Sequence, residues 1–324
     1  MMNATEPTSA GHASGAAPRP VAAGRSRVVN AMSVDVEDYY QVSAFAGTIT
    51  RADWPNYPSR VERNTDRILE LFAEAKVRAT FFMLGCIAER HPNLVRRIVE
   101  EGHELASHGL SHYRVFEQTP DEFREDVSRT KKILEDLGGV AVKGYRAASF
   151  SINRETWWAF DVLAETGYTY SSSINPIRHD HYGVPDADRF PFRPNGPGSD
   201  ERGPGRARPD GFGLLEIPIT TVELLGRRLP CGGGGYFRLF PYALWRQGLR
   251  RVNETEGRPA IFYFHPWEID PEQPRITTAP RRSRLRHYVN LKGMEAKLRR
   301  ALSDFAWSRV DEVFLDNGKG VAGL

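Results

Sequence analysis

From residue 28 to residue 315, short apolar runs alternate with amphipathic stretches, and this rhythm constrains the fold more than any other feature of the chain. The runs at 28–36, 79–84 and 260–265 have the β-branched and aromatic content of buried strands. Stretches with helical spacing lie between them. Strands that alternate with helices in this way are typical of parallel βα units. The fold class is therefore expected to be α/β, either a barrel or a doubly wound sheet.

Helix start and stop signals place the elements more closely. The clearest helix is predicted at 119–138, where Thr119 and Glu122 form a capping box. Ser59 and Glu62 have the same spacing and predict a second helix start. Further helices are expected at 92–102, 153–167 and 291–305, and further strands at 214–219 and 310–315.

Composition divides the chain into a tail and a folded part. The first 27 residues are small, polar and rich in Pro and Gly, so they cannot bury enough apolar surface to fold. They are expected to form a disordered tail, and residues 28–324 a single domain. Residues 175–213 interrupt the rhythm with Pro, Gly and charge, and are predicted to form an insertion loop.

Charge and cysteine content exclude several classes of protein. Lys and Arg number 44 and Asp and Glu 41, and the net charge of +3 is too small to indicate a nucleic-acid partner. No run approaches the ~20 apolar residues that cross a bilayer. The first 27 residues also lack the apolar core of a secretory signal, so we expect a cytoplasmic protein. Cys86 and Cys231 lie outside any CxxC pair, which excludes a disulfide scaffold and a structural zinc–cysteine site. The oligomeric state stays open.

Three acidic residues crowd the predicted end of the first strand. Because side chains alternate across a strand, Asp35 and Glu37 leave the same face, while Asp38 begins the turn. Such a cluster is either a solvated loop or the surroundings of a cation. Active sites of parallel α/β folds assemble at the carboxyl ends of strands, which is where these acids lie.

Basic and imidazole side chains occur at other predicted strand ends. His108 and His112 lie four residues apart, a spacing with which two imidazoles can face one point. With an upstream carboxylate they supply a two-histidine, one-carboxylate set that leaves positions open for water and substrate. His265 ends an apolar strand and is either a structural histidine or a candidate acid or base. Arg146 is either a surface cation or the partner of Asp35.

The order of these segments resembles a known family. SVDVED, ASHGLSH, GYRAASF and YFHPWE are similar to the motifs of the polysaccharide deacetylases, the NodB-like carbohydrate esterases, over about residues 28–315. Two later segments, CGGGGYFRLFP (231–241) and RHYVNLKGMEAKLRRAL (286–302), resemble a bacterial subgroup found with exopolysaccharide and exosortase gene clusters. The resemblance implies a distorted (β/α)7 barrel of the NodB-like type, with a subgroup-specific region at about 230–315.

The resemblance also implies a role for each motif residue. Asp35 matches the base that activates water, and Arg146 matches the arginine that orients this base. His108 and His112 match the two metal-binding histidines. His265 matches the general acid that protonates the leaving amine. The implied cofactor is a divalent metal, with zinc expected.

The chain departs from the family pattern in three places. Val36 stands where the commonest motif has a second, metal-binding aspartate. Glu37 is favoured as the ligand because it shares a strand face with Asp35, and Asp38 is the alternative. Ala148 replaces a proline beside Ser149, whose backbone N–H is expected to serve the oxyanion. The acid that tunes the catalytic histidine has no evident match, and it is expected near residues 171–173.

Taken together, these residues predict a metal-dependent hydrolase that removes N-acetyl groups from the amino sugars of an exopolysaccharide or its precursor. The expected partner is therefore an N-acetylated oligo- or polysaccharide. Tyr145, Tyr236 and Trp267 are predicted platforms for a sugar ring, the alternative for each being core packing. Two other functions stay open, namely an amidohydrolase of a cyclic ureide or imide on the same scaffold, and a non-catalytic carbohydrate-binding protein.

Overall fold

A curled parallel sheet forms the centre of the protein. The computed structural model describes residue 1 and residues 28–179, 182–194 and 213–315. The strands follow the order β10-β1-β2-β3-β4-β5-β6, and β9 also pairs with β1. All of these pairings are parallel, as the alternation of the sequence predicts. The strands are β1 Val29–Val36, β2 Thr80–Met83, β3 Glu104–Ser107, β4 Gly144–Tyr145, β5 Tyr170–Ser171, β6 Leu215–Glu216, β9 Ile261–Phe264 and β10 Ala306–Ser308.

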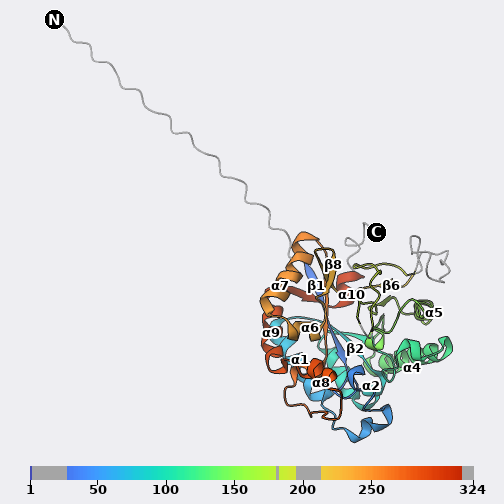
Figure 1. The fold of residues 1–324 in the computed structure, drawn as a ribbon. Helices are drawn as coiled ribbons and strands as arrows, with labels where there is room; N and C mark the ends of the chain where they lie inside the picture. Colours follow the sequence, from blue (N-terminus) through green and yellow to red (C-terminus); the bar gives the residue numbers. More distant parts are fainter. Residues whose placement is uncertain (2–27, 180–181, 195–212, 316–324) are drawn as a thin grey trace.

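Helices flank the sheet. Figure 1 shows α1, α7 and α9 on one side of the central strands, and α4 and α5 on the opposite side. Among the described residues, no helix is long and apolar enough to cross a membrane. The α-helices are α1 Val61–Ala75, α2 Gly85–Arg90, α3 Pro92–Glu100, α4 Pro120–Gly138, α5 Ala159–Glu165, α6 Gly234–Leu239, α7 Tyr242–Arg250, α8 Arg281–Tyr288, α9 Leu291–Asp304 and α10 Val310–Phe314.

The two faces of β1 point to different surroundings. Met32, Val34 and Val36 belong to the large apolar core that also includes residues of the flanking helices. Ala31 belongs to a second, smaller cluster inside the curl of the sheet. Since successive side chains alternate, Asp35 shares this interior face with Ala31. The sheet therefore carries one acid of the first motif into its interior.

A helix starts at both predicted places, but only one of the two predicted capping boxes forms. The side chain of Thr119 accepts a hydrogen bond from the backbone of Glu122, and the capping box of α4 forms as predicted. At α1, Ser59 and Glu62 form no capping box, and the N-cap residue is Arg60 with no side-chain cap of its own. The carboxylate of Asp38, more than 20 residues away along the chain, takes this capping role.

The end of the chain differs from the prediction. Residues 310–314 form helix α10 rather than a strand, and the last strand is β10, directly before it. Tertiary contacts decide this, because Thr80 Oγ1 and Glu104 Oε2 accept hydrogen bonds from the first backbone N–H groups of α10. Local apolar content alone does not reveal such partners. The predicted tail, apart from residue 1, and about half of the predicted insertion loop lie outside the described residues.

A run of glycines bridges the gap between β6 and β9. The N–H of Gly232 donates to the carbonyl of Thr220 at 2.8 Å, and its carbonyl accepts from the N–H of Tyr263 at 2.8 Å. A Cβ atom at Gly232 would lie 2.7 Å from the carbonyl oxygen of Ile261, so a larger residue does not fit. An antiparallel hairpin precedes this run, with β7 at Thr221–Leu224 and β8 at Arg227–Pro230.

Candidate active site

Three side chains that can bind metal converge beyond the carboxyl ends of β1 and β3. Glu37 follows β1, and His108 and His112 follow β3. Their ligand atoms all lie within 4.8 Å of one another, and all three residues are buried. Nδ1 of His108 lies 2.8 Å from the carbonyl oxygen of Arg146. A carbonyl can only accept, so this nitrogen carries the proton and Nε2 keeps a free lone pair.

The surroundings of Glu37 fit a cation. Its Oε2 lies 3.0 Å from Nε2 of His112, yet it has no hydrogen-bond partner of acceptable geometry among the described residues. A buried carboxylate oxygen without a partner is costly. A divalent cation would satisfy it, and two imidazoles with one carboxylate form a donor set that zinc accepts. The residues present therefore fit a divalent metal.

The neighbouring carboxylate, Asp38, is engaged elsewhere. Its Oδ2 accepts hydrogen bonds from Ser59 Oγ at 2.8 Å and from the backbone N–H groups of Arg60 and Val61 at 2.8 and 3.2 Å. Its Oδ1 accepts from the backbone of Tyr39 at 3.0 Å. Asp38 thus caps α1 across the fold, and it is not the carboxylate that joins the histidines.

Asp35 lies against a buried guanidinium. Nη1 of Arg146 donates to Asp35 Oδ1 at 2.5 Å and to Ser33 Oγ at 3.0 Å. Nε and Nη2 of the same side chain donate to the carbonyl and hydroxyl oxygens of Ser172. Arg146 has no exposed surface, so it is not the surface cation that the sequence left as an alternative. It orients one oxygen of Asp35 and leaves the other toward the site.

His265 stands at the opposite side of the same centre. Its Nε2 lies 3.1 Å from Glu37 Oε1 and 4.0 Å from Asp35 Oδ2. Its Nδ1 lies 2.8 Å from Glu268 Oε1, and Nε of Arg238 donates to Glu268 Oε2 at 2.7 Å. The geometry brings the candidate base, the candidate acid and the candidate ligands together.

The acid beside the histidine is in a different place from the one expected. It is Glu268, three residues after His265 in the same motif, and the expectation of an acid near residues 171–173 is wrong. Those serines contact other groups: Ser172 accepts from Arg146, and Ser173 Oγ accepts from the backbone of Ala147 at 2.9 Å. The sequence signal was the short turn after β9, where residues three apart come close.

Burial and neighbouring charges set the protonation of these groups. Burial opposes the charge of Glu37, but the three nearby imidazoles outweigh it and lower its pKa to about 2. Burial disfavours the imidazolium of His265, but the surrounding carboxylates raise its pKa to about 9. For His108, burial dominates and lowers the pKa to about 4. The site therefore holds a neutral imidazole on one side and a protonated one on the other.

The third motif adopts a strained backbone. Ser149 and Phe150 have φ angles of 55° and 51°, in the left-handed region that non-glycine residues rarely adopt. The hydroxyl of Ser149 forms a hydrogen bond with that of Ser43, and the ring of Phe150 packs 4.9 Å from that of Tyr263. Such strain persists only where the surroundings hold it, and it clusters at functional sites. The oxyanion role of the Ser149 N–H stays a prediction.

Two of the three predicted sugar platforms have different surroundings from those expected. Tyr145 is 2% exposed, and its ring packs 5.7 Å from each of Phe123 and Tyr168. Its platform role is wrong, because its face belongs to the core. Tyr236 is half-buried on α6 with its ring 5.9 Å from that of Phe240. Its role stays a prediction.

Trp267 is the second platform that the structure corrects. It is 6% exposed and stacks nearly parallel to two histidine rings, 5.1 Å from that of His265 and 4.1 Å from that of His287. So little of the indole is exposed that no sugar can stack on it. Its position instead supports the ring of His265.

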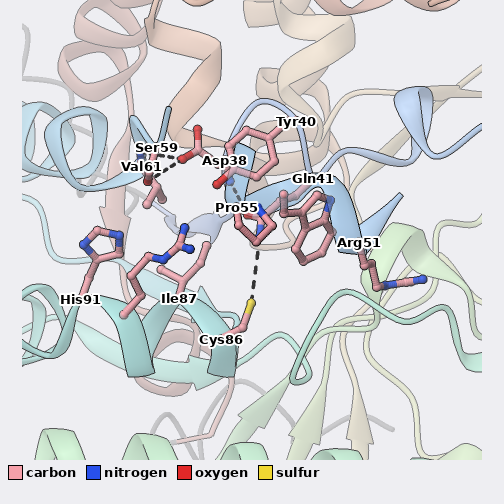
Figure 2. A pocket seen from close by; sticks show the side chains of 12 residues that line it. Asp38, Tyr40, Gln41, Arg51, Pro55, Ser59, Val61, Cys86, Ile87 and His91 are labelled. Atoms are coloured by element: carbon pink, nitrogen blue, oxygen red, sulfur yellow. Dashed lines mark hydrogen bonds between the residues drawn. The ribbon is translucent and has the colours of Figure 1, made fainter. Parts of the chain in front are cut away.

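Two hollows lie along residues 40–54, and one of them adjoins the site. The first, of about 220 Å³, reaches the site through His112 and Ser43. The second, of about 160 Å³, lies between this segment and α2, where Figure 2 shows Gln41 directed at the thiol of Cys86. Four residues line both hollows: Tyr40, Gln41, Arg51 and Trp54. The four shared residues place the two hollows next to each other, and only the first reaches a residue of the candidate metal site.

Sequence reasoning missed the residues that hold the metal-site loop. Arg51 donates to the carbonyl oxygens of Ser111 and His112 at 2.8 and 2.7 Å. The Oδ1 of Asp126, on α4, accepts from the backbone of Leu110 at 2.9 Å. These contacts fix a backbone in which His112 has a φ of 55°. No local signal identifies them, since an arginine in an irregular segment and an acid on a helix are common surface residues.

Two protein families match different parts of the chain. Residues 49–171 match the polysaccharide deacetylase family, and this stretch includes His108, His112 and Arg146. Residues 172–315 match a domain of unknown function, DUF3473, and this stretch includes His265 and Glu268. The site therefore draws residues from both matched stretches, while Asp35 and Glu37 precede them.

Relatives and solved structures agree with this assignment. The chain is 42% identical over 125 residues to a peptidoglycan-N-acetylglucosamine deacetylase of Bacillus cereus, covering 35% of this chain and 46% of that protein. It is 31% identical over 100 residues to a chitooligosaccharide deacetylase of Bradyrhizobium sp., covering 31% of this chain and 43% of that protein. The chain thus spans less than half the length of either relative.

The solved structures resemble the chain over most of its length. One is a Mycobacterium smegmatis protein assigned to the polysaccharide deacetylases, with a TM-score of 0.53, 21% identity and 91% coverage of both chains. Another is Puue allantoinase, with a TM-score of 0.52, 18% identity and 92% coverage of both chains. At these identities the likeness concerns the fold, and it supports the distorted barrel.

Proposed function

We propose that the chain, whose residues 49–171 match the polysaccharide deacetylase family, removes N-acetyl groups from the amino sugars of an exopolysaccharide in a metal-dependent reaction. One observation carries the proposal. Glu37, which lies with His108 and His112, is 3.1 Å from His265, and His265 is 4.0 Å from Asp35. This is the arrangement that amide hydrolysis needs, because it places a base, an acid and a cation site around one point.

Asp35 is the proposed general base. Arg146 stabilises its ionised form and holds one carboxylate oxygen. The other oxygen is available to accept a proton from water as the water attacks the acetamide carbonyl. A base of this kind typically contributes ~10²–10⁴-fold to the rate.

His265 is the proposed general acid. An amine leaves a tetrahedral intermediate poorly unless it receives a proton, and Nε2 of His265 faces the site while Nδ1 is held by Glu268. The surrounding carboxylates keep its pKa high, so the ring is protonated at neutral pH. Transfer of the Nε2 proton to the nitrogen of the sugar gives acetate and a free amine.

Glu37, His108 and His112 are the proposed ligands of the metal, which we expect to be zinc. When bound there, a divalent cation polarises the acetamide carbonyl and eases deprotonation of water. The carbonyl of Arg146 sets the tautomer of His108, and Nε2 of the ring is therefore available to bind the cation. The backbone N–H near Ser149 is proposed to stabilise the oxyanion.

The choice of an exopolysaccharide rests on sequence likeness and on the two hollows along residues 40–54. Segments 231–241 and 286–302 resemble the exopolysaccharide-associated subgroup. The hollows along residues 40–54 extend from the site beside Trp54, which is half-buried and can contact a sugar ring. Hollows beyond the reacting group leave room for further sugar units, which a small ureide does not need.

Acetate release tests this function. We expect the zinc-loaded chain to release acetate from N-acetylglucosamine oligomers, to lose this activity on chelation and to regain it when zinc returns. Asp35→Asn is the matched control, because it should keep zinc and lose turnover. Hydrolysis of a cyclic ureide without acetate release would favour the amidohydrolase alternative. Sugar binding without either reaction would favour the non-catalytic one.

A further inference from the structure

The two C-terminal segments that resemble the exopolysaccharide subgroup pack together behind His265. Segment 231–241 contains α6, and segment 286–302 contains the end of α8 and most of α9. They meet at Arg238, whose side chain is 2% exposed. Nothing in the proposed chemistry uses Arg238 directly, so its burial needs another explanation.

Arg238 is held on all sides of its guanidinium. Nη1 donates to the carbonyl oxygens of His287 and Val289, both at 2.7 Å, and Nε donates to Glu268 Oε2 at 2.7 Å. A guanidinium is planar and presents its donors in a fixed fork. Its contacts with two main-chain carbonyls therefore fix the direction in which it presents Nε to the carboxylate.

The backbone of Arg238 is held from the other segment as well. Asn290 Nδ2 donates to its carbonyl at 2.9 Å. Nζ of Lys297, on α9, donates to the carbonyl oxygens of Phe237, Arg238 and Phe240 at 3.0, 3.0 and 2.7 Å. The last turn of α6 is thus attached to α9 by one ammonium group.

Glu268, held by Arg238, in turn fixes the orientation of the His265 imidazole. Its Oε1 accepts from the backbone N–H of His265 at 3.1 Å and lies 2.8 Å from Nδ1 of the ring. The carboxylate is 1% exposed, so it depends on these partners and on Arg238 for its charge. Trp267 also restricts the ring of His265, because the indole stacks nearly parallel to it and is itself stacked on the ring of His287.

The glycine run leaves the space that Glu268 occupies. A Cβ atom at Gly234, the first residue of α6, would lie 2.7 Å from the carboxyl carbon of Glu268. Real Cβ contacts are never so short, and the carboxyl group is the part that can move. At the next residue, Gly235, a Cβ atom would meet nothing within 4 Å.

We infer that the two subgroup segments exist to position the general acid. Gly234 and Arg238 are positioning residues that act through Glu268, and they fix the ring of His265 so that Nε2 faces the reacting nitrogen. The inference rests on the proposed role of His265, and it assigns a task to the DUF3473 part of the chain.

Two adjacent substitutions test this positioning role. Gly234→Ala should push the carboxylate of Glu268 away from His265, and Gly235→Ala is the matched control in the same helix turn. We expect Gly234→Ala to lower kcat for an N-acetyl sugar by ~10- to 100-fold, the scale of a small misplacement of a reacting group. Hydrolysis of an activated aryl acetate, whose phenolate needs no proton, should change far less. Zinc affinity should equal that of the wild type.

Arg238→Gln provides a second variant with the same expected signature. Replacement by Lys should restore part of the amide activity, because an ammonium still pairs with Glu268. Equal losses on amide and ester, or an equal effect of Gly235→Ala, would overturn the inference. A drop in zinc affinity as large as the drop in kcat would overturn it too.

A readout that needs no catalysis separates this inference from the proposed function. The ¹⁵N shifts of the His265 ring in the zinc-loaded chain, at one fixed pH, report the hydrogen bond to Glu268. A change in Gly234→Ala and Arg238→Gln, with none in Gly235→Ala, supports the positioning role even if no sugar is deacetylated. Unchanged shifts in the two variants would overturn it even in an active enzyme.

Discussion

The two sides of the site hold their imidazoles by different means. On the β3 side, a main-chain carbonyl accepts from His108, and Arg51 donates to the carbonyl of His112. On the β9 side, the ring of His265 meets the carboxylate of Glu268, itself paired with a buried guanidinium. Backbone contacts serve one side, and buried charges serve the other.

The difference follows from what each ring has to do. A metal ligand must offer a lone pair, and a carbonyl partner fixes its tautomer without adding a charge. A proton donor must be cationic, and a carboxylate partner stabilises the cation. The pKa shifts of the two rings agree with these roles: the pKa of His108 is lowered to about 4, and that of His265 is raised to about 9. The comparison predicts distinct losses when each side is damaged.

The largest effect is expected on the metal side. His108→Ala or His112→Ala should abolish activity and lower zinc affinity by more than the ~10–100-fold typical of losing a group that only orients a ligand. Glu37→Gln should behave in the same way. Asp38→Asn is its control, because that side chain caps α1, and it should keep zinc. Zinc titration by calorimetry measures both, and full zinc occupancy in either histidine variant would contradict the ligand set.

The next effect concerns the base between the two sides. Asp35→Asn should keep zinc but lose ~10²–10⁴-fold in turnover, since the amide cannot accept the proton of water. Activity and metal content measured on the same preparation test this. A variant that loses zinc together with activity would make Asp35 a ligand and remove the distinction between base and metal site.

A smaller and more selective effect is expected on the acid side. His265→Ala should lower deacetylation of an N-acetyl sugar by ~10²-fold while leaving an activated aryl acetate nearly unaffected. The comparison is informative because the amine of the sugar needs a proton to leave and the phenolate of the aryl acetate does not. Zinc affinity should not change. Equal losses on both substrates would make His265 a residue that positions the substrate rather than a proton donor.

An effect on stability rather than on turnover is expected from Asp126, which holds the loop between β3 and His112. Burial raises the pKa of this carboxyl from 3.8 to about 6, partly offset by the N–H of Leu110 and by Arg51. The folded state therefore binds the proton more tightly than the unfolded chain. Below pH 3.8 the carboxyl is protonated in both states and does not affect stability. The free energy of unfolding falls as the pH rises from 3.8 to about 6, and it stays lowered above that. At 1.36 kcal/mol per unit the cost is at most about 3 kcal/mol.

Asp126→Asn should remove this pH dependence. Asparagine keeps the carbonyl oxygen that accepts from Leu110 and carries no charge. Urea unfolding at pH 8 should find the variant more stable than the wild type, and unfolding near pH 4 should find the two nearly equal. The same difference at both pH values would show that charge at Asp126 plays no part.

Local patterns predicted the fold well where each element depends on its own residues. The strands at 28–36, 79–84 and 260–265 and the helix at 119–138 occur close to their predicted bounds. Period and capping are local, so one sequence reveals them. Residues 310–314 differ because their helix depends on distant acceptors on β2 and β3.

By itself, the sequence determined which chemical groups reach the site. The order of the strands and their alternating side chains carry Asp35, His108, His112 and His265 to one edge of the sheet, because parallel strands end together. The family resemblance added their expected roles. These features are fixed by spacing along the chain, and spacing is what a sequence records.

Only the tertiary structure decided how adjacent and distant residues divide their tasks. Glu37 joins the histidines while Asp38 caps α1, although both are carboxylates in one motif. Trp267 stacks on His265 and is not exposed to a sugar. Arg238, 30 residues before Glu268 in the sequence, forms an ion pair with it. The physical reason is that a buried polar group must find its partner in space, and sequence distance does not show which partner is near.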